Sequence, residues 1–166
     1  PAGYQRILTG GRRPARTASN CPSSSSSTAH RIQGDMSNRK EMLAAAERAI
    51  LERRPGTMVG MLHVHLRRLR QISIALDHDI ADAVPGAAEE RLRAFLRSAD
   101  LVARIGEQDF MVVLPNLLSP GHAELAAQRV LREFERPLHV LGRLIEATVA
   151  LGLAWSPEHA GSADAL

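Results

Sequence analysis

Residues 97–110, RSADLVARIGEQDF, decide the fold. In and just after this stretch, two short apolar segments, 101–105 and 110–114, flank the residues 106–109, which begin with a glycine. Two strand-like segments joined by a short glycine-containing link predict a β-hairpin. The rest of the chain is therefore interpreted around a sheet that contains this hairpin.

Helical and strand-like patterns alternate on both sides of the hairpin. Apolar residues recur at helical spacing in residues 38–53, 66–79 and 123–134. A further helix is expected to start near Pro85, because proline suits the first turn of a helix. Short apolar runs that are typical of strands occupy residues 57–65, 138–140 and 145–154, and residues 115–121 are expected to form a loop. This order predicts an α/β or α+β sandwich with one central sheet.

The length and composition fit one domain with a hydrophobic core, since the chain has 166 residues of which 45% are hydrophobic. No run of 18 uncharged apolar residues occurs, so we expect no membrane span. The single cysteine, Cys21, excludes an internal disulfide and a cysteine-rich metal site, and no signal-peptide pattern opens the chain. We therefore expect a cytoplasmic protein.

Residues 1–33 differ in composition from the rest of the chain. They contain the serine run 23–27, scattered Gly, Pro and Arg, and no sustained apolar period. Such a segment cannot bury enough apolar surface to offset chain entropy, so we predict a disordered Ser- and Arg-rich leader or linker. The net charge of +3 arises from residues 1–37, because these residues hold five Arg and one Asp. Beyond Tyr4 the segment has no aromatic residue on which bases could stack, and we expect no nucleic-acid partner.

Four stretches of the chain resemble the GGDEF domain of the diguanylate cyclase family, in the same order and at the same spacing. Residues 97–110 are similar to the family pattern RxSDLVARLGGDEF, with GEQDF in place of GGDEF. Residues 36–39 resemble the LPNR that opens the domain, residues 65–73 resemble DLDRFKxxN, and residues 148–157 resemble TxSIGIALYP. The resemblance places a GGDEF domain at residues 34–166, and it implies that the chain stops before the last helix of the domain.

This resemblance implies a fold and an activity. The fold is a nucleotide-cyclase palm-like sandwich, in which helices flank a central, mostly antiparallel sheet of five strands. In active members two domains each bring a GTP, and the product is cyclic di-GMP. That reaction needs two Mg²⁺ ions, which prefer carboxylate oxygens as ligands.

The residues at the expected catalytic positions depart from the family pattern. His65 and Gln108 stand where the resemblance implies the two metal-binding carboxylates, and Glu107 replaces the second glycine of the motif. Imidazole is a poor Mg²⁺ ligand and an amide carries no charge, so we expect no metal cofactor and no catalytic residue. Asp109 stands in place of the motif's Glu, and we expect Phe110 to pack in the core.

The segment around His65 carries further nitrogen-bearing side chains. His63 and His65 share one face of a strand; a third ligand would make a Zn²⁺ site, whereas hydrogen-bonded histidines in the core or a pocket are the favoured interpretation. Arg67, Arg68 and Arg70 form either a metal-free phosphate cradle or, as we favour, a solvated basic helix start.

Little of the guanine-binding pattern that the resemblance implies is present. Ser73 replaces the family Asn, and Ile74 replaces the acidic residue next to it. His78 and Asp82 match the histidine and the aspartate of a glycine-containing segment of the family pattern. Asp82 could accept from a guanine edge or cap a helix that starts near Pro85, and we favour the cap.

One ligand-binding pattern of the family is intact, namely Arg97 and Asp100 in an RxxD arrangement five residues before Gly106. The resemblance implies an allosteric site for cyclic di-GMP, in which Arg contacts guanine and phosphate and Asp accepts from the guanine N1 and N2 hydrogens. The alternative is that Arg97 is a cation at a helix C-terminus and Asp100 a turn residue. The sequence leaves both interpretations open.

Three functions follow as hypotheses. The favoured one is a catalytically inactive GGDEF domain that regulates cyclic di-GMP signalling and binds cyclic di-GMP at Arg97 and Asp100. The second is an active diguanylate cyclase that uses two GTP molecules, with trace activity supported by Mn²⁺. The third is an interaction domain without a ligand that controls an adjacent phosphodiesterase domain. Antiparallel pairing of two domains in a homodimer is a further implication of the resemblance.

Overall fold

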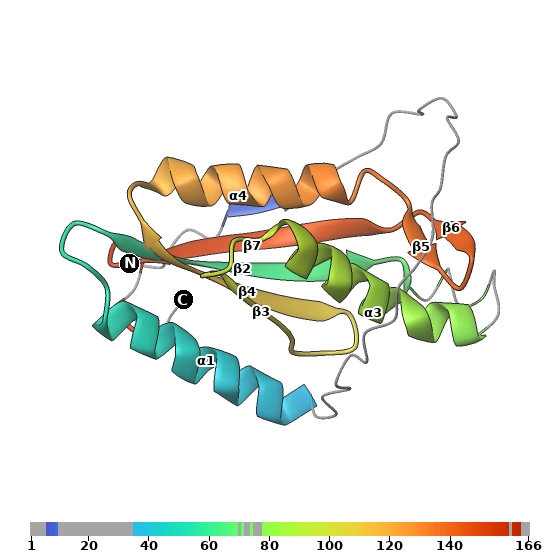
Figure 1. Cartoon of the computed structure of the whole chain (residues 1–166), viewed down its shortest axis with the longest axis horizontal. Coiled ribbons are helices and arrows are strands. Elements are labelled where there is room, and N and C mark those ends of the chain that lie inside the picture. The colour runs from blue at the N-terminus through green and yellow to red at the C-terminus, as the bar shows by residue number, and fades with distance from the viewer. Residues whose placement is uncertain are drawn as a thin grey trace.

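The computed structural model describes residues 6–9, 35–69, 71, 74, 78–159 and 161–163 of the chain. A five-stranded sheet forms the centre, with α1 on one face and α3 and α4 on the other (Figure 1). The face toward α3 and α4 carries the larger hydrophobic core, and the face toward α1 carries a smaller one. In the described part of the chain, no helix combines the length and the apolar character that crossing a bilayer requires.

The strand order is β1-β7-β2-β4-β3, and every neighbouring pair is antiparallel. The strands are β1 (Arg6–Thr9), β2 (Met58–Arg67), β3 (Leu101–Arg104), β4 (Asp109–Leu117) and β7 (Thr148–Ser156). β2 lies at the centre and alternates between the two faces, with Leu62, Val64 and Leu66 fully buried beneath α3 and α4. The expected five-stranded antiparallel sheet and the hairpin of β3 and β4 are therefore confirmed.

The strands predicted at residues 138–140 and 145–154 do not both join this sheet. β5 (Leu138–Val140) pairs with β6 (Arg143–Ile145) in a separate two-stranded sheet, and β7 begins only at Thr148. The link between β5 and β6 has positive φ at Leu141 (46°) and Gly142 (77°). Two successive residues of positive φ make the tight turn of a two-residue hairpin, so β5 pairs with the strand that follows it at once.

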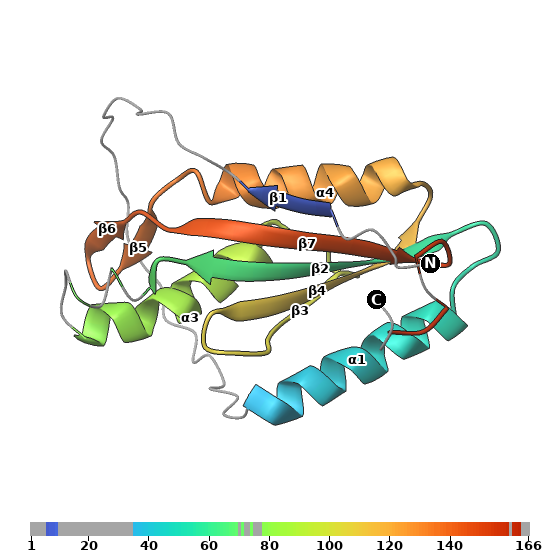
Figure 2. The ribbon, with the colours of Figure 1, turned by 180° about the vertical axis from the view of Figure 1, so that it is seen from behind.

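β1 supplies the fifth strand of the main sheet, and it comes from the predicted leader. Arg6 pairs with Leu153 and Thr9 with Ala150, at the outer edge of β7 (Figure 2). The prediction of a leader without regular structure is wrong for these four residues, because an unpaired strand edge can bind a short apolar and β-branched segment. The prediction for most of residues 1–33 lies outside the described residues.

The helices are α1 (Asp35–Leu51), α3 (His78–Phe95) and α4 (Pro120–Glu133). α1 and α4 confirm two predicted helices, whereas β4 runs two residues past Pro115 into the predicted loop. The helix predicted at residues 66–79 is wrong at its start, because β2 continues to Arg67; several of its other residues lie outside the described part.

The predicted start of the next helix at Pro85 is also wrong, because Pro85 lies inside α3. An interior proline removes one backbone hydrogen bond and costs about 3 kcal/mol. The buried residues of α3 continue through this position: Ile80, Ala81, Val84, Pro85, Ala88 and Leu92. Burial of this apolar face offsets the cost and holds one helix across the proline.

Candidate functional site

The turn between β3 and β4 is fixed against the end of β2 by backbone hydrogen bonds. The N–H groups of Ile105 and Gly106 donate to the carbonyl oxygen of Asp109 at 2.8 and 3.2 Å. The N–H of Leu66 donates to the carbonyl oxygen of Gln108 at 2.8 Å. The residues of the GEQDF motif therefore lie next to the residues that end β2.

Side-chain contacts also define the conformation of the turn. The Arg104 guanidinium donates to the carbonyl oxygens of Gly106 (2.9 Å) and Glu107 (3.1 Å). A Cβ atom on Gly106 would lie 3.1 Å from Asp109 Oδ2, so a larger residue at 106 would displace the Asp109 side chain. Glu107, which replaces a family glycine, is exposed. The turn is thus ordered even though only its first glycine is kept.

Two imidazoles meet the Asp109 carboxylate on the face of the sheet toward α1. His65 pairs with Asp109 across β2 and β4, and its Nδ1 forms a 2.8 Å hydrogen bond with Asp109 Oδ1. His63 Nε2 lies 3.0 Å from the same oxygen, and the two form an ion pair when the imidazole is protonated. The expected hydrogen-bonded histidine is confirmed for His65, but neither histidine lies in the core, since 52% of the His63 side chain and 44% of the His65 side chain are exposed.

These residues do not fit the Mg²⁺ site that the resemblance implies. Of the residues that meet at the motif, His65 and Gln108 supply no carboxylate, and Asp109 is already bonded to His65 and in contact with His63. Mg²⁺ requires near-octahedral oxygen coordination, and a single occupied carboxylate does not provide it. Within the described ranges, no three His, Cys, Asp or Glu side chains are grouped so as to hold a metal ion.

Of the expected guanine-binding positions, the structure describes Ile74 and Asp82, and both side chains are exposed. Ile74 is 79% exposed, and Ser73 lies outside the described residues. Asp82 is exposed on α3, four residues after the first residue of the helix at His78. The favoured prediction of Asp82 as a helix cap is therefore wrong, because the helix begins earlier than Pro85.

The RxxD residues lie in the turn between α3 and β3. The backbone N–H of Arg97 donates to Asp100 Oδ2 at 2.9 Å, and the N–H of Asp100 donates to the carbonyl oxygen of Arg97 at 3.0 Å. Asp100 therefore acts as a turn residue, as one of the two interpretations held. This turn uses one carboxylate oxygen of Asp100 and only backbone atoms of Arg97, so it is compatible with ligand binding by the Arg97 side chain.

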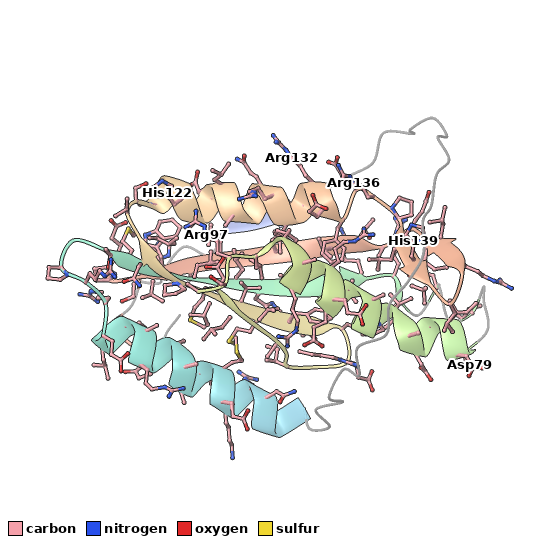
Figure 3. All side chains as sticks on the ribbon, viewed as in Figure 1. Asp79, Arg97, His122, Arg132, Arg136 and His139 are labelled. Carbon is pink, nitrogen blue, oxygen red and sulfur yellow. The ribbon has the colours of Figure 1, made fainter. Side chains whose placement is uncertain are left out.

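A small pocket of about 30 Å³ joins the RxxD turn to α4. Arg97 and Asp100 line it together with His122, Leu125 and Arg129 of α4, and Figure 3 shows Arg97 and His122 on the same part of the molecule. Neither His122 nor Arg129 is recognisable as a site residue from the sequence, because it is the packing of α4, which begins at Pro120, that brings them to this pocket.

Hydrogen bonds of Arg91 connect α3 to the C-terminal end of α4. Its guanidinium donates to the carbonyl oxygens of Glu133 (3.1 Å), Arg136 (2.6 Å) and Pro137 (2.6 Å). Burial lowers the pKa of Arg91 from its ordinary value, while the nearby Glu133 carboxylate acts in the opposite direction. Since α3 leads into Arg97 and α4 carries Arg129, Arg91 helps to set the distance between the two sides of the RxxD pocket.

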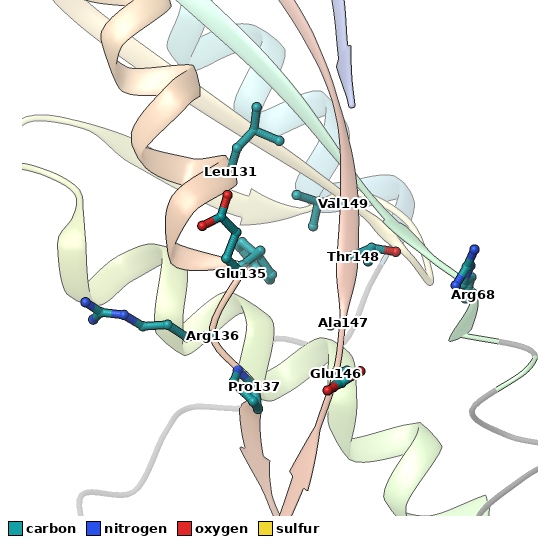
Figure 4. Close-up of a pocket in the computed structure, with 10 residues that line it drawn as sticks. Arg68, Leu131, Glu135, Arg136, Pro137, Glu146, Ala147, Thr148 and Val149 are labelled. Carbon is teal, nitrogen blue, oxygen red and sulfur yellow. The ribbon is translucent and has the colours of Figure 1, made fainter. Parts of the chain in front are cut away.

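A larger pocket of about 100 Å³ lies between the end of α4 and the start of β7 (Figure 4). Two basic residues, Arg68 at positive φ after β2 and Arg136, line it together with two acidic residues, Glu135 and Glu146. The two acids offset the two cations, so this pocket does not favour a phosphate group. Arg67 is exposed, as the favoured interpretation of a solvated basic helix start expected, but it ends β2 and starts no helix, so that part of the interpretation is wrong. Arg70 lies outside the described residues.

Comparison with known proteins supports the resemblance. The family model described as "Diguanylate cyclase, GGDEF domain" matches residues 34–166. The diguanylate cyclase TpbB of Pseudomonas aeruginosa is 31% identical over 109 residues, which are 65% of this chain and 25% of that protein. The cyclic di-GMP phosphodiesterase NbdA of the same species is 28% identical over 102 residues, which are 61% of this chain and 13% of that protein. The chain thus spans a quarter or less of the length of these relatives.

Solved structures agree with the fold. The crystal structure of the GGDEF domain of YfiN (TpbB) from P. aeruginosa matches with a TM-score of 0.72 and 28% identity, over 77% of this chain and 81% of that chain. An EAL/GGDEF domain protein from M. capsulatus matches with a TM-score of 0.62 and 28% identity, over 78% of this chain and 84% of that chain. The expected palm-like fold is confirmed.

Proposed function

From the premise that this chain belongs to the diguanylate cyclase GGDEF-domain family, we propose that it is a catalytically inactive member acting as a regulatory module in cyclic di-GMP signalling. The observation that carries the proposal is the state of Asp109. Its carboxylate is hydrogen-bonded to His65 at 2.8 Å and lies 3.0 Å from His63. This is the place where cyclase chemistry would need free oxyanions to neutralise Mg²⁺.

The electrostatics of the motif oppose GTP turnover. Glu107 adds a negative charge to the turn, and neither His65 nor Gln108 contributes an oxyanion that could bind a divalent ion. Without bound metal, the charge that develops during attack on an α-phosphate is not neutralised. We therefore propose no resident metal and no catalytic residue in this chain.

The ligand that we propose is cyclic di-GMP, bound beside Arg97 and Asp100. The turn leaves the Arg97 guanidinium outside its hydrogen bonds, and it uses Oδ2 of Asp100, so Oδ1 can accept from guanine. His122 and Arg129 lie across the same pocket and supply further donors for phosphate. The apolar residues Phe95 and Leu125 also line it and offer surface to a purine.

Two measurements test the proposal. Incubation with GTP and either Mg²⁺ or Mn²⁺ should give no cyclic di-GMP, and product at ordinary cyclase rates would contradict it in favour of the active enzyme. Calorimetric titration with cyclic di-GMP should give binding that is lost in Arg97→Ala and in Asp100→Ala. Arg93→Ala is the matched control, because Arg93 is also exposed near the end of α3 but pairs with Glu89.

A chain without cyclic di-GMP affinity would instead support the interaction domain. The relative NbdA is named a phosphodiesterase, and one solved relative is an EAL/GGDEF domain protein, which makes control of a neighbouring phosphodiesterase domain the specific alternative. The proposal also includes a cytoplasmic location, based on the single cysteine, and a homodimer, based on the pairing that the cyclase reaction uses in this family.

A further inference from the structure

The outer edge of β7 is closed by a strand that is distant in sequence. β1 has four residues, Arg6–Thr9, and residues 10–34 separate it from α1. Among the described strands, β1 pairs with β7 alone, whereas β7 also pairs with β2 along all nine of its residues. β1 is therefore held at one edge only, while β7 is anchored independently of it.

The edge of β7 needs a partner for physical reasons. A strand edge presents a row of N–H and C=O groups that template the addition of another strand. β1 covers the stretch from Ala150 to Leu153, where Leu151 and Leu153 are almost fully buried, each at 1% exposure. The middle of β7, which is paired with β2 on its other side, is thus an acceptor for a short extended segment, by strand addition.

We propose that this edge is a strand-acceptor site, which the segment Arg6–Thr9 fills within one chain and which the same segment of a second copy fills in a strand-exchanged dimer. The second copy is the occupant that the structure favours, because its segment has the sequence and register already seen on β7. An intervening stretch of this length can extend over on the order of 80 Å, which is enough to reach a neighbouring molecule. The exchange makes a closed two-fold dimer with no new contact surface.

Concentration decides between the two arrangements. A tethered segment has an effective concentration in the millimolar range, so pairing of Arg6–Thr9 with β7 of its own chain should dominate at micromolar protein. The exchanged dimer should become populated as the protein concentration approaches that range.

The acceptor site is tested with the full-length variant Ile7→Pro/Leu8→Pro. Successive residues of a strand point their N–H groups to opposite sides, so one of the two prolines removes a donor that faces β7. The probe is a fluorescent peptide of residues 4–11, YQRILTGG, followed by anisotropy. We expect it to bind the proline variant and to bind the unaltered chain at least tenfold more weakly, because β1 fills the edge there.

The matched control is Ile7→Ala/Leu8→Ala, which keeps both N–H groups and should exclude the peptide as the unaltered chain does. A folded proline variant that does not bind the peptide, or equal binding to variant and unaltered chain, would overturn the acceptor site. In a second measurement, isotopically labelled and unlabelled chains are mixed at high concentration and examined by native mass spectrometry. Mixed dimers are expected for the unaltered chain and should be lost in Ile7→Pro/Leu8→Pro, whose segment cannot pair with β7. Mixed dimers that persist in the proline variant, or their absence in the unaltered chain, would overturn the second copy as the occupant.

Discussion

The β3–β4 hairpin and the α3–β3 turn keep different parts of the family pattern. The hairpin keeps its backbone geometry, with Gly106 close against Asp109, but His65 and Gln108 have replaced the side chains that would bind metal. The α3–β3 turn keeps both residues of the RxxD pattern, Arg97 and Asp100. Residues that hold a strand pairing and residues that bind a ligand are therefore under separate physical requirements, so the backbone of the hairpin forms without the family's side chains at positions 65 and 108.

The largest expected effect is at the α3–β3 turn. Replacing both residues, Arg97→Ala with Asp100→Ala, removes charge-assisted contacts of about 1.5–3 kcal/mol each, so cyclic di-GMP affinity should fall about 100-fold or more. Titration calorimetry measures the change. In the hairpin, Glu107→Ala should leave this affinity within about twofold. Equal losses at the two regions would contradict their separation.

The next effect concerns the connection of α3 to α4. Arg91→Ala removes three hydrogen bonds to carbonyl oxygens at the end of α4 and should lower the free energy of unfolding by about 2 kcal/mol. Chemical denaturation measures this loss. The exposed pair of Arg93 and Glu89 provides the control, since Arg93→Ala should cost no more than about 0.5 kcal/mol. If the two variants lose equal stability, the proposed fastening of α3 to α4 is wrong.

A smaller effect is expected at the hairpin glycine. Gly106→Ala would bring Cβ to 3.1 Å from Asp109 Oδ2 and 3.2 Å from Asp109 Cβ, and the required shift should cost about 1 kcal/mol of unfolding free energy. Thermal and chemical unfolding measure the change. Gly86 in α3 is the matched control, because a Cβ there meets nothing within 4 Å, and Gly86→Ala should stabilise the helix by up to about 1 kcal/mol. A neutral Gly106→Ala would show that the turn tolerates a displaced Asp109.

Local patterns explain what the sequence could predict. The hairpin, α1 and α4 follow from apolar spacing and from a glycine or proline at their ends, all of which act within a few residues. Pro85 misled the prediction because the buried face of α3 extends on both sides of it. β1 was missed because its pairing with β7 joins segments that are more than 140 residues apart, which no local pattern reports.

The sequence predicts which residues make up the candidate site, but it does not predict which of their side chains contact one another. The sequence identified His65, Gln108, Arg97 and Asp100 as the decisive positions. It could not show that His65 and Asp109 meet, because that contact depends on the register of β2 with β4. It also missed Arg129, which the packing of α4 brings to the pocket of Arg97.

The smallest expected effect comes from restoring the hairpin. The triple variant His65→Asp, Glu107→Gly and Gln108→Asp returns two carboxylates and a glycine, so Mn²⁺ affinity should rise and be measurable by calorimetry. Turnover of GTP should still stay near the detection limit. Ile74 cannot accept a hydrogen bond from guanine and is 79% exposed, so the base is held poorly even when metal is bound.

Chromatographic detection of cyclic di-GMP decides this prediction, with the unaltered chain as the control. Metal binding without product would mean that turnover is limited by the base-binding segment as well as by the charges of the hairpin. Robust turnover would mean the opposite, since three residues would then account for the whole difference between the hairpin and an active site. The amount of product therefore measures how much of the cyclase activity the β3–β4 hairpin can regain, independently of ligand binding at the α3–β3 turn.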